Sequence, residues 1–235
     1  MIKPAIPPAL KNRLPGRAAG LFLAAWCLAL IGPPVTAKAQ SLILETAPQG
    51  PPAGSSTEPR RKPAKNGLPD GRVAAATRNS DIAEAWYTAP TRRYRHGALG
   101  DVIEGGALTV LTASGGQLTY TLPEEAVFED ITPRLADLNG DGRMEVVTIL
   151  SLAHAGGSVA VFGLEDGKLV QKAVSKPIGR SNRWLNIAGI ADFAGFGRLQ
   201  IAYVETPHIG GTLKVLDWRG KDLKVIASMP GFSNH

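Results

Sequence analysis

Short runs of alternating apolar and polar residues recur along the chain at a nearly constant spacing. A Gly-Gly pair followed by such a run occurs at residues 105–111, 156–162 and 210–216, at spacings of 51 and 54 residues. After each run comes a glycine-containing turn and a further alternating run. Alternation with a period of two predicts β-strands, and Asp-Gly between two such runs predicts a hairpin. The pattern therefore predicts a repeated antiparallel unit.

A second landmark is in register with the first. Residues 136–147 match residues 191–202 at an offset of 55, so each unit reads as strand, Asp/Gly loop, strand, Gly-Gly turn, strand, glycine turn and strand. Four antiparallel strands are the content of one β-propeller blade. We predict an all-β fold, a partial β-propeller of about two and a half four-stranded blades. One blade is expected at about 129–175 and the next at about 184–228, with a partial blade before them.

An array of this size cannot close into a ring, because propellers have about four to eight blades. Either further blades are missing from this chain or another molecule supplies the closing surface. The sequence ends at 231–235, inside a connection that in the preceding repeat leads to the next Asp loop, which favours truncation.

The first 39 residues have the layout of a secretory signal peptide. They contain five basic residues and no acidic one, and the apolar run 18–32 is shorter than the roughly 20 residues of a membrane span. Two prolines end the run before the small-residue site at 37–39, which predicts cleavage before Gln40. We expect an exported protein, periplasmic or secreted, with no membrane span in its mature form. An uncleaved membrane anchor is the alternative.

Removal of this leader changes the charge and the cysteine content. The formal charge of the whole chain is +6, but the remaining residues carry 21 basic and 20 acidic side chains, a balance of +1. Nothing in that balance indicates a nucleic-acid partner. The single cysteine lies inside the leader, so the mature chain has no disulfide and must be held together by packing or by a metal.

Residues 40–80 are rich in proline, glycine and serine, and we predict a disordered linker there. The repeat domain is expected to span 81–235. Its first stretch, residues 80–87, is either a short helix capped by Ser80 or the first packed segment of the domain.

The candidate chemistry lies in the loop of the first complete repeat. Four side-chain oxygens and one backbone carbonyl are spaced to surround a hard cation, and Ca²⁺ fits that demand better than Mg²⁺: these are Asp137, Asn139, Asp141, Arg143 through its carbonyl, and Glu145. The twelfth position is Thr148, within a β-branched run, so a strand follows the loop and an EF-hand is excluded. The alternative is an Asp/Asn/Gly-rich turn without an ion, in which the carboxylates would repel one another.

Residues 94–235 resemble the FG-GAP/VCBS repeats, the calcium-loop blades of integrin-α-type propellers and of many exported bacterial proteins. The loop 137–145 is the most specific part, and 132–137, 183–185 and 233–235 are similar to a bacterial subgroup whose members continue with further blades. The resemblance implies that Asp137, Asn139, Asp141 and Glu145 are side-chain ligands of Ca²⁺ and that Arg143 is a carbonyl ligand.

The chain also departs from this family. The Phe-Gly and Gly-Ala-Pro signatures are not present as such. The second loop keeps Asp192 but has Ala194, Phe196 and Gln200 at the remaining ligand positions, so we expect it to be metal-free, with Phe196 as a packing residue.

No catalytic motif is visible: the sequence has no Gly-x-Ser-x-Gly elbow, no phosphate-binding glycine loop and no His-Glu-x-x-His. The acidic pairs at 124–125 and 129–130 are expected to be solvated loop charges. We therefore expect a calcium-binding repeat module with a structural or binding role and no enzymatic activity, whose partner would be a protein or a polysaccharide.

An enzyme or a saccharide-binding or saccharide-processing domain of propeller type is the alternative. Its active site would lie in missing blades or on a rim formed by His154 and His208, which occupy equivalent repeat positions. Trp184 and Trp218 would form either a sugar-stacking platform or inter-blade packing.

Overall fold

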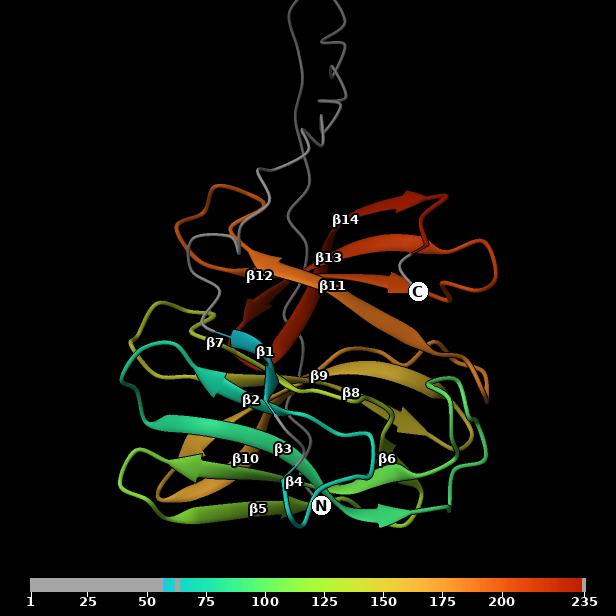
Figure 1. Ribbon diagram of the computed structural model, residues 1–235. Coiled ribbons are helices and arrows are strands. Elements are labelled where there is room, and N and C mark those ends of the chain that lie inside the picture. The colour runs from blue at the N-terminus through green and yellow to red at the C-terminus, as the bar shows by residue number, and fades with distance from the viewer. Residues whose placement is uncertain (1–56, 62–63, 234–235) are drawn as a thin grey trace, which may run out of the picture. The chain divides into compact units, whose positions relative to one another are not determined.

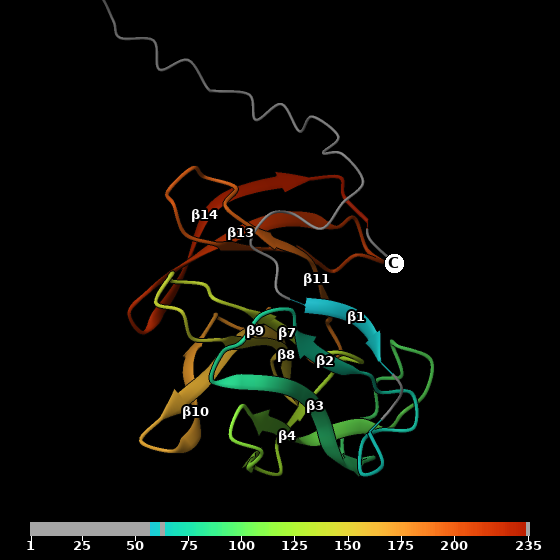
Figure 2. The same ribbon diagram turned by 60° about the vertical axis from the view of Figure 1, so that its left-hand side comes forward.

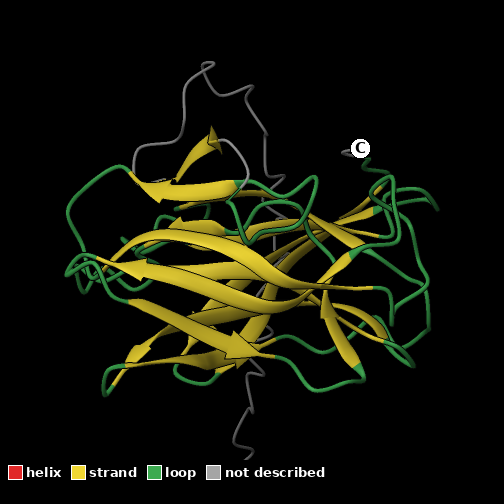
Figure 3. Ribbon diagram, turned by 60° about the horizontal axis from the view of Figure 1, so that its bottom comes forward, coloured by secondary structure: helices red, strands yellow, loops and turns green. Residues whose placement is uncertain are grey.

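The computed structural model describes residues 57–61 and 64–233, which form strands and loops without any helix. The predicted signal peptide lies outside these residues, as does the linker up to residue 56. Fourteen strands form two antiparallel sheets (Figures 1 and 3), and the all-β prediction is confirmed. Within the described ranges, no helix is long and apolar enough to span a bilayer.

The strands fall into three consecutive four-stranded meanders, which we call the first, second and third units. The first comprises β2 (Val73–Ala76), β3 (Ile82–Thr91), β4 (Glu104–Thr112) and β5 (Gln117–Thr121). The second comprises β7 (Arg134–Ala136), β8 (Glu145–Leu152), β9 (Gly156–Glu165) and β10 (Lys168–Val174). The third comprises β11 (Leu185–Ala191), β12 (Gln200–Glu205), β13 (Thr212–Arg219) and β14 (Asp222–Pro230).

Two further strands connect or extend these units. The strand β6 (Ala126–Phe128) pairs with β8 and also touches β4 through Gly105 and Phe128, which joins the first two units into one ten-stranded sheet. The strand β1 (Thr57–Arg61) pairs with β2 at the edge of that sheet. The third unit is a separate four-stranded sheet.

The second unit lies between the other two, because both faces of β8 and β9 are apolar (Figures 1 and 2). On one face Val146 and Phe162 belong to a buried cluster with Leu108 of the first unit. On the other face Val147 and Val161 belong to a second cluster with residues of β11, β12 and β13, among them Ile187, Ile201 and Leu216. A strand buried on both faces has a nearly continuous apolar sequence, and residues 146–152 are apolar except for the buried Thr148 and Ser151.

The packed fold begins before residue 81, the boundary expected from composition. Leu68 and Ala74 are buried in the core of the first unit, and β2 pairs with β3 through Ala74 and Ala75. The first unit therefore has four strands, where half a blade was predicted. The sequence did not predict the strand β2, because the surrounding segment is rich in proline and glycine. The short β2 sequence forms a strand only because it pairs with β3 and is buried there.

Residues 82–91 form a strand and not the helix that was one expectation for 80–87. Its residues alternate, so that Ala85 and Tyr87 join the core shared with the second unit, while Trp86 donates its Nε1 hydrogen to Asn66 Oδ1 (3.1 Å). Pairing with β2 and β4 on either side decides the strand conformation.

Candidate metal centre

The loop between β7 and β8 is closed by its first aspartate. Asp137 Oδ1 accepts hydrogen bonds from the backbone amides of Gly140 (2.8 Å) and Asp141 (3.0 Å), and Oδ2 accepts one from the amide of Gly142 (2.9 Å). Gly140 and Gly142 have positive φ angles of 79° and 88°, which a glycine adopts without steric cost. The side chain of Asp137 thus fixes the path of the backbone around the loop.

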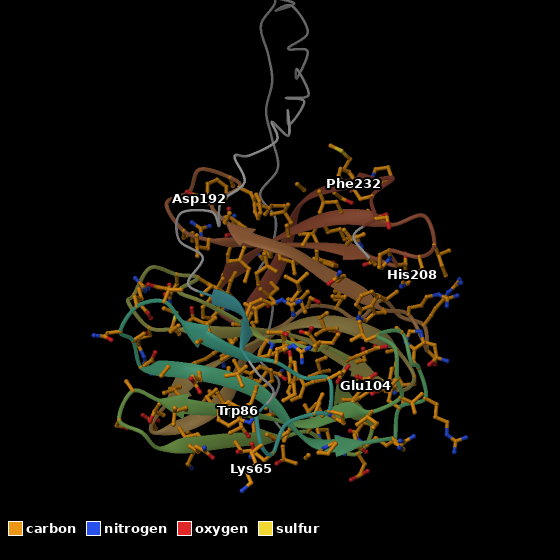
Figure 4. The ribbon with its side chains drawn as sticks, in the orientation of Figure 1. Lys65, Trp86, Glu104, Asp192, His208 and Phe232 are labelled. Carbon is orange, nitrogen blue, oxygen red and sulfur yellow. The ribbon has the colours of Figure 1, made fainter. Side chains whose placement is uncertain are left out.

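The equivalent loop of the third unit closes in the same way. Asp192 accepts the amides of Phe196 and Gly197, both at 2.8 Å, and it lies at the β11–β12 end of that unit (Figure 4). This loop has Ala194, Phe196 and Gln200 at the other ligand positions. The two turns therefore share their closure, in which the first aspartate binds amides of the turn and glycines adopt positive φ angles.

The middle of the first loop holds its polar side chains against one another. Asn139 Nδ2 donates to Asp141 Oδ2 (3.0 Å), and Asn139 Oδ1 accepts the amide of Asp141 (3.0 Å). Asp141 Oδ1 accepts the amide of Arg143 (2.8 Å). These hydrogen bonds are exposed, so a change of rotamer at Asn139 or Asp141 would not disturb the core.

Glu145 is the buried member of the predicted ligand set, with 5% of its surface exposed. Its Oε2 accepts the amide of Leu138 (2.9 Å). Burial, together with the nearby carboxylates of Asp141, Asp137 and Asp81, raises the pKa of Glu145 to about 7. The loop therefore concentrates negative charge around a carboxyl group that lacks full solvation.

The third unit places a neutral side chain at the same point. Gln200 accepts the amide of Ala194 (3.0 Å) through Oε1 and donates to the carbonyl of Arg198 (2.8 Å) through Nε2. A buried amide can satisfy a donor and an acceptor at once without carrying charge. With Gln200 at the position equivalent to Glu145, the second loop keeps one carboxylate, Asp192, where the first loop has Asp137, Asp141 and Glu145.

Two residues of the first unit contact this loop and were not found by sequence reasoning. Arg78 Nη2 lies 2.5 Å from Asp137 Oδ2. Asp81 accepts the amide of Met144 (2.9 Å) and the Nε hydrogen of Arg143 (2.9 Å). Although burial opposes it, these hydrogen bonds lower the pKa of Asp81. No local pattern marks these residues, because they lie about 60 positions upstream of their partners.

Arg198 makes the corresponding contact within its own unit. Its Nε and Nη2 donate to the two carboxylate oxygens of Asp217 at 3.0 and 2.7 Å, which stabilises the charged carboxylate and lowers the pKa of Asp217 despite burial. Phe196 is 49% exposed and has the Arg198 guanidinium 4.9 Å from its ring centroid. Phe196, which was expected to be a packing residue, lies on the loop surface, where its ring contacts Arg198.

The structure brings four of the five predicted ligand residues to one cleft of about 440 Å³. Asn139, Asp141, Arg143 and Glu145 line it together with residues of β9, β10, β13 and the β13–β14 turn, among them Lys172 and Trp218. Asp137 is not part of this lining and binds the amides of its own turn. Among the residues described, no three acidic or histidine side chains are arranged to hold a metal ion. The donor chemistry suits Ca²⁺, and coordination would require Asn139 and Asp141 to turn from their present hydrogen bonds.

The other candidates from the sequence lie apart from one another. His154 is exposed on the β8–β9 turn, while His208 lines a small pocket with Trp184. Trp184 is only 6% exposed and donates its Nε1 hydrogen to the Glu129 carbonyl (3.3 Å). Trp218 lines the cleft beside the first loop. The two histidines thus do not share a pocket lining, and neither do the two tryptophans.

The acidic pair 129–130 is buried and not solvated. Glu129 accepts hydrogen bonds from His96 Nδ1 (2.5 Å) and from the Ser151 hydroxyl. Asp130 accepts the Tyr87 hydroxyl (2.8 Å) and is paired with Arg134. Burial raises the pKa of both carboxyl groups. The sequence predicted solvated carboxylates in a loop. It does not reveal that β6 pairs with β8, or that side chains from other segments of the chain bind Glu129 and Asp130.

Comparisons of this chain with family models, with curated proteins and with solved structures give no match.

The shared closure of the two loops leads to a stability prediction. Replacing Asp137 by alanine removes three hydrogen bonds to backbone amides, and we expect a loss of about 1–2 kcal/mol in the free energy of unfolding already in the absence of Ca²⁺. Asp192→Ala is the matched variant and should cost a similar amount in the third unit. Urea unfolding in the presence of a chelator measures both losses. A loss at Asp137 seen only with Ca²⁺ would contradict closure by hydrogen bonds alone.

Proposed function

We propose that this chain is an exported calcium-binding repeat module with a structural or binding role and no enzymatic activity. In this proposal the three units are blades of an open β-propeller of the FG-GAP/VCBS type. Face-to-face stacking of four-stranded antiparallel units supports it, because this is the way in which neighbouring propeller blades pack. The partner would be a protein or a polysaccharide.

The single observation that carries the calcium proposal is the difference between the two loops at one position. Both loops share the closing aspartate, but only the first combines Asp141 with the buried Glu145. Burial, and after it the neighbouring carboxylates, makes ionisation of Glu145 costly, whereas Gln200 meets its hydrogen-bonding needs without charge. A bound divalent cation would offset that cost, and oxygen donors of this kind favour Ca²⁺.

Export is proposed from the signal-like leader, and it gives the calcium a structural use. A mature chain without cysteine has no disulfide to reinforce its two sheets. Charge neutralisation at the first loop would stabilise the contact between the first and second units, because Asp81 and Arg78 of the first unit reach this loop.

Thermal unfolding with calcium and with chelator tests the proposal. Ca²⁺ at about 100 times its Kd should stabilise the protein by about 2.7 kcal/mol through mass action, and its melting temperature should rise accordingly. Asp141→Ala should abolish this rise, since it removes a ligand whose side chain is exposed and makes no core contact. Glu125→Ala is the matched control, because it removes an exposed acid outside the loop.

Glu145→Gln gives the first loop the same neutral side chain that the second loop has at Gln200. This variant should lose the response to Ca²⁺ while keeping a folded loop, as Gln200 does in the third unit. Identical melting curves of the parent protein with calcium and with chelator would overturn the calcium proposal. An unchanged response in Asp141→Ala and Glu145→Gln would place the bound ion elsewhere.

A further inference from the structure

A small pocket lies at the end of the third unit opposite to the Asp/Gly loop. Figure 4 places Asp192 and His208 at opposite ends of this unit. The pocket has a volume of about 120 Å³ and is formed by the β12–β13 turn, by residues 182–184 preceding β11 and by His96 from the β3–β4 connection. It therefore joins parts of the first and third units that are more than 80 residues apart in the sequence.

The charged and polar side chains that line this pocket are His96, Asn182, Arg183, Thr206 and His208. No aspartate or glutamate is among its described lining residues. Arg183 carries a permanent positive charge and a guanidinium group that suits planar or tetrahedral oxyanions. In a domain whose charge is almost balanced, this local excess of cationic and donor groups favours an anion.

The buried Glu129 orients His96. Its Oε1 atom lies 2.5 Å from His96 Nδ1, and its side chain is fully buried. This contact fixes the orientation of the imidazole ring. The other ring nitrogen, Nε2, donates a hydrogen bond whenever it carries a hydrogen.

His208 is held by an aromatic contact and by a tight turn. Its ring stacks on Trp184 with centroids 5.8 Å apart and an interplanar angle of 22°. The turn is closed by the amide of Ile209, which donates to the carbonyl of Thr206 (2.9 Å), and Thr206 has a positive φ of 50°. A non-glycine residue in this conformation is uncommon, and such strain is concentrated at functional sites. The stack and the turn give His208 a defined position at the pocket.

We propose that this pocket binds a small oxyanion, either free or as the acidic group of a larger ligand, through Arg183, His96 and His208. A volume of about 120 Å³ accommodates one carboxylate or phosphate group. Trp184 supplies an apolar wall against which the anion is partly desolvated, and this strengthens its charge-assisted hydrogen bonds. This site does not depend on the calcium loop at the opposite end.

Isothermal titration of the full chain at pH 6 with inorganic phosphate and, separately, with glucuronate tests the site. We expect saturable binding with one site per chain. Arg183→Gln should weaken it at least about 10-fold, because a charge-assisted hydrogen bond is lost, and His208→Gln should weaken it in the same direction. Tighter binding of glucuronate than of phosphate would assign the anion to a sugar acid, and the reverse order would assign it to a free or phosphate-borne group.

Two control variants separate the pocket from general surface charge. Arg180→Gln removes an exposed guanidinium three residues away, and His154→Gln removes the histidine at the equivalent turn of the second unit. Neither residue lines the pocket, so both variants should bind as the parent does. Absence of saturable binding of either probe, or equal losses in the control variants, would overturn the proposal. Thermal melts of each variant verify that it is folded.

Discussion

Replacement of Gly156 by alanine is expected to lower the free energy of unfolding by at least about 3 kcal/mol. Gly156 begins β9 with a φ of 75°, and a Cβ atom there would lie 2.4 Å from the carbonyl oxygen of Arg180 and 2.7 Å from that of Arg183. These are backbone atoms of the segment that leads into the third unit. Relief of the clash would therefore disturb the junction between the second and third units, in addition to the cost of a left-handed conformation.

Gly210 is the matched position of the next repeat. It has a φ of 63°, but a Cβ atom added there would meet no other atom within 4 Å. Gly210→Ala should therefore cost only about 1 kcal/mol, the conformational part of the effect. Urea unfolding of both variants, with the slope of the transition unchanged, measures the difference. Equal losses would show that the crowding around Gly156 has no energetic consequence.

Glu104→Gln is expected to remove a decline of stability of about 3 kcal/mol that the parent protein shows between pH 6 and pH 9. Glu104 is 3% exposed at the start of β4. Burial is the main cause that raises its pKa from 4.5 to about 8, and the carboxylates of Glu129, Asp70, Asp101 and Asp130 add to it. The folded protein thus binds a proton at Glu104 more tightly than the unfolded chain does.

The sign of the pH dependence follows from this raised pKa. The stability that protonated Glu104 contributes is fully present below about pH 4.5 and is lost as the pH rises through about 8. A glutamine cannot ionise, so the variant should lose this decline and exceed the parent protein above pH 8. Denaturant unfolding at pH 6 and pH 9 measures it. Glu124→Gln, whose side chain is 92% exposed, is the control and should leave the profile unchanged.

Unequal profiles for the two glutamine variants are the critical result. Suppose that the free energy of unfolding of Glu104→Gln equalled that of the parent protein at both pH values. The pKa of Glu104 would then not be raised in the folded state, and its burial near Glu129 and Asp130 would not destabilise the protein in alkaline solution. The measurement also distinguishes this cluster from the calcium loop, because Glu104 does not line the cleft next to Glu145.

The closure of the two Asp/Gly loops could be predicted from sequence because it is local. Asp137 and Asp192 bind amides three to five residues ahead, and the intervening glycines permit the turn. The same holds for the hairpins, where alternation and glycine turns define strands before any distant contact forms. The predicted ligands are equally local, but Asn139 and Asp141 can satisfy their side chains within the loop itself, as they do here, so the calcium site stays a prediction.

Contacts between units could not be predicted in this way. Asp81 of the first unit reaches Arg143 and Met144 of the second, and His96 meets the buried Glu129 from another segment. The repeat pattern grouped His154 with His208 as an alternative site, whereas the lining of the pocket contains His96 and His208 and does not contain His154. Residues at equivalent positions of consecutive repeats lie in different four-stranded units. Which of their side chains come into contact depends on the path of the segments that connect these units.

The sequence by itself determined the all-β class, the repeated four-stranded unit and the turn at Asp137, since each depends on residues within a few positions of one another. The tertiary structure alone decided that β2 completes the first unit, that Glu104 and Glu129 are buried, and that Arg78 and Asp81 contact the loop of the second unit. The physical reason is that burial and charge pairing depend on which faces of the sheets pack together, and that packing is set by segments far apart in the sequence.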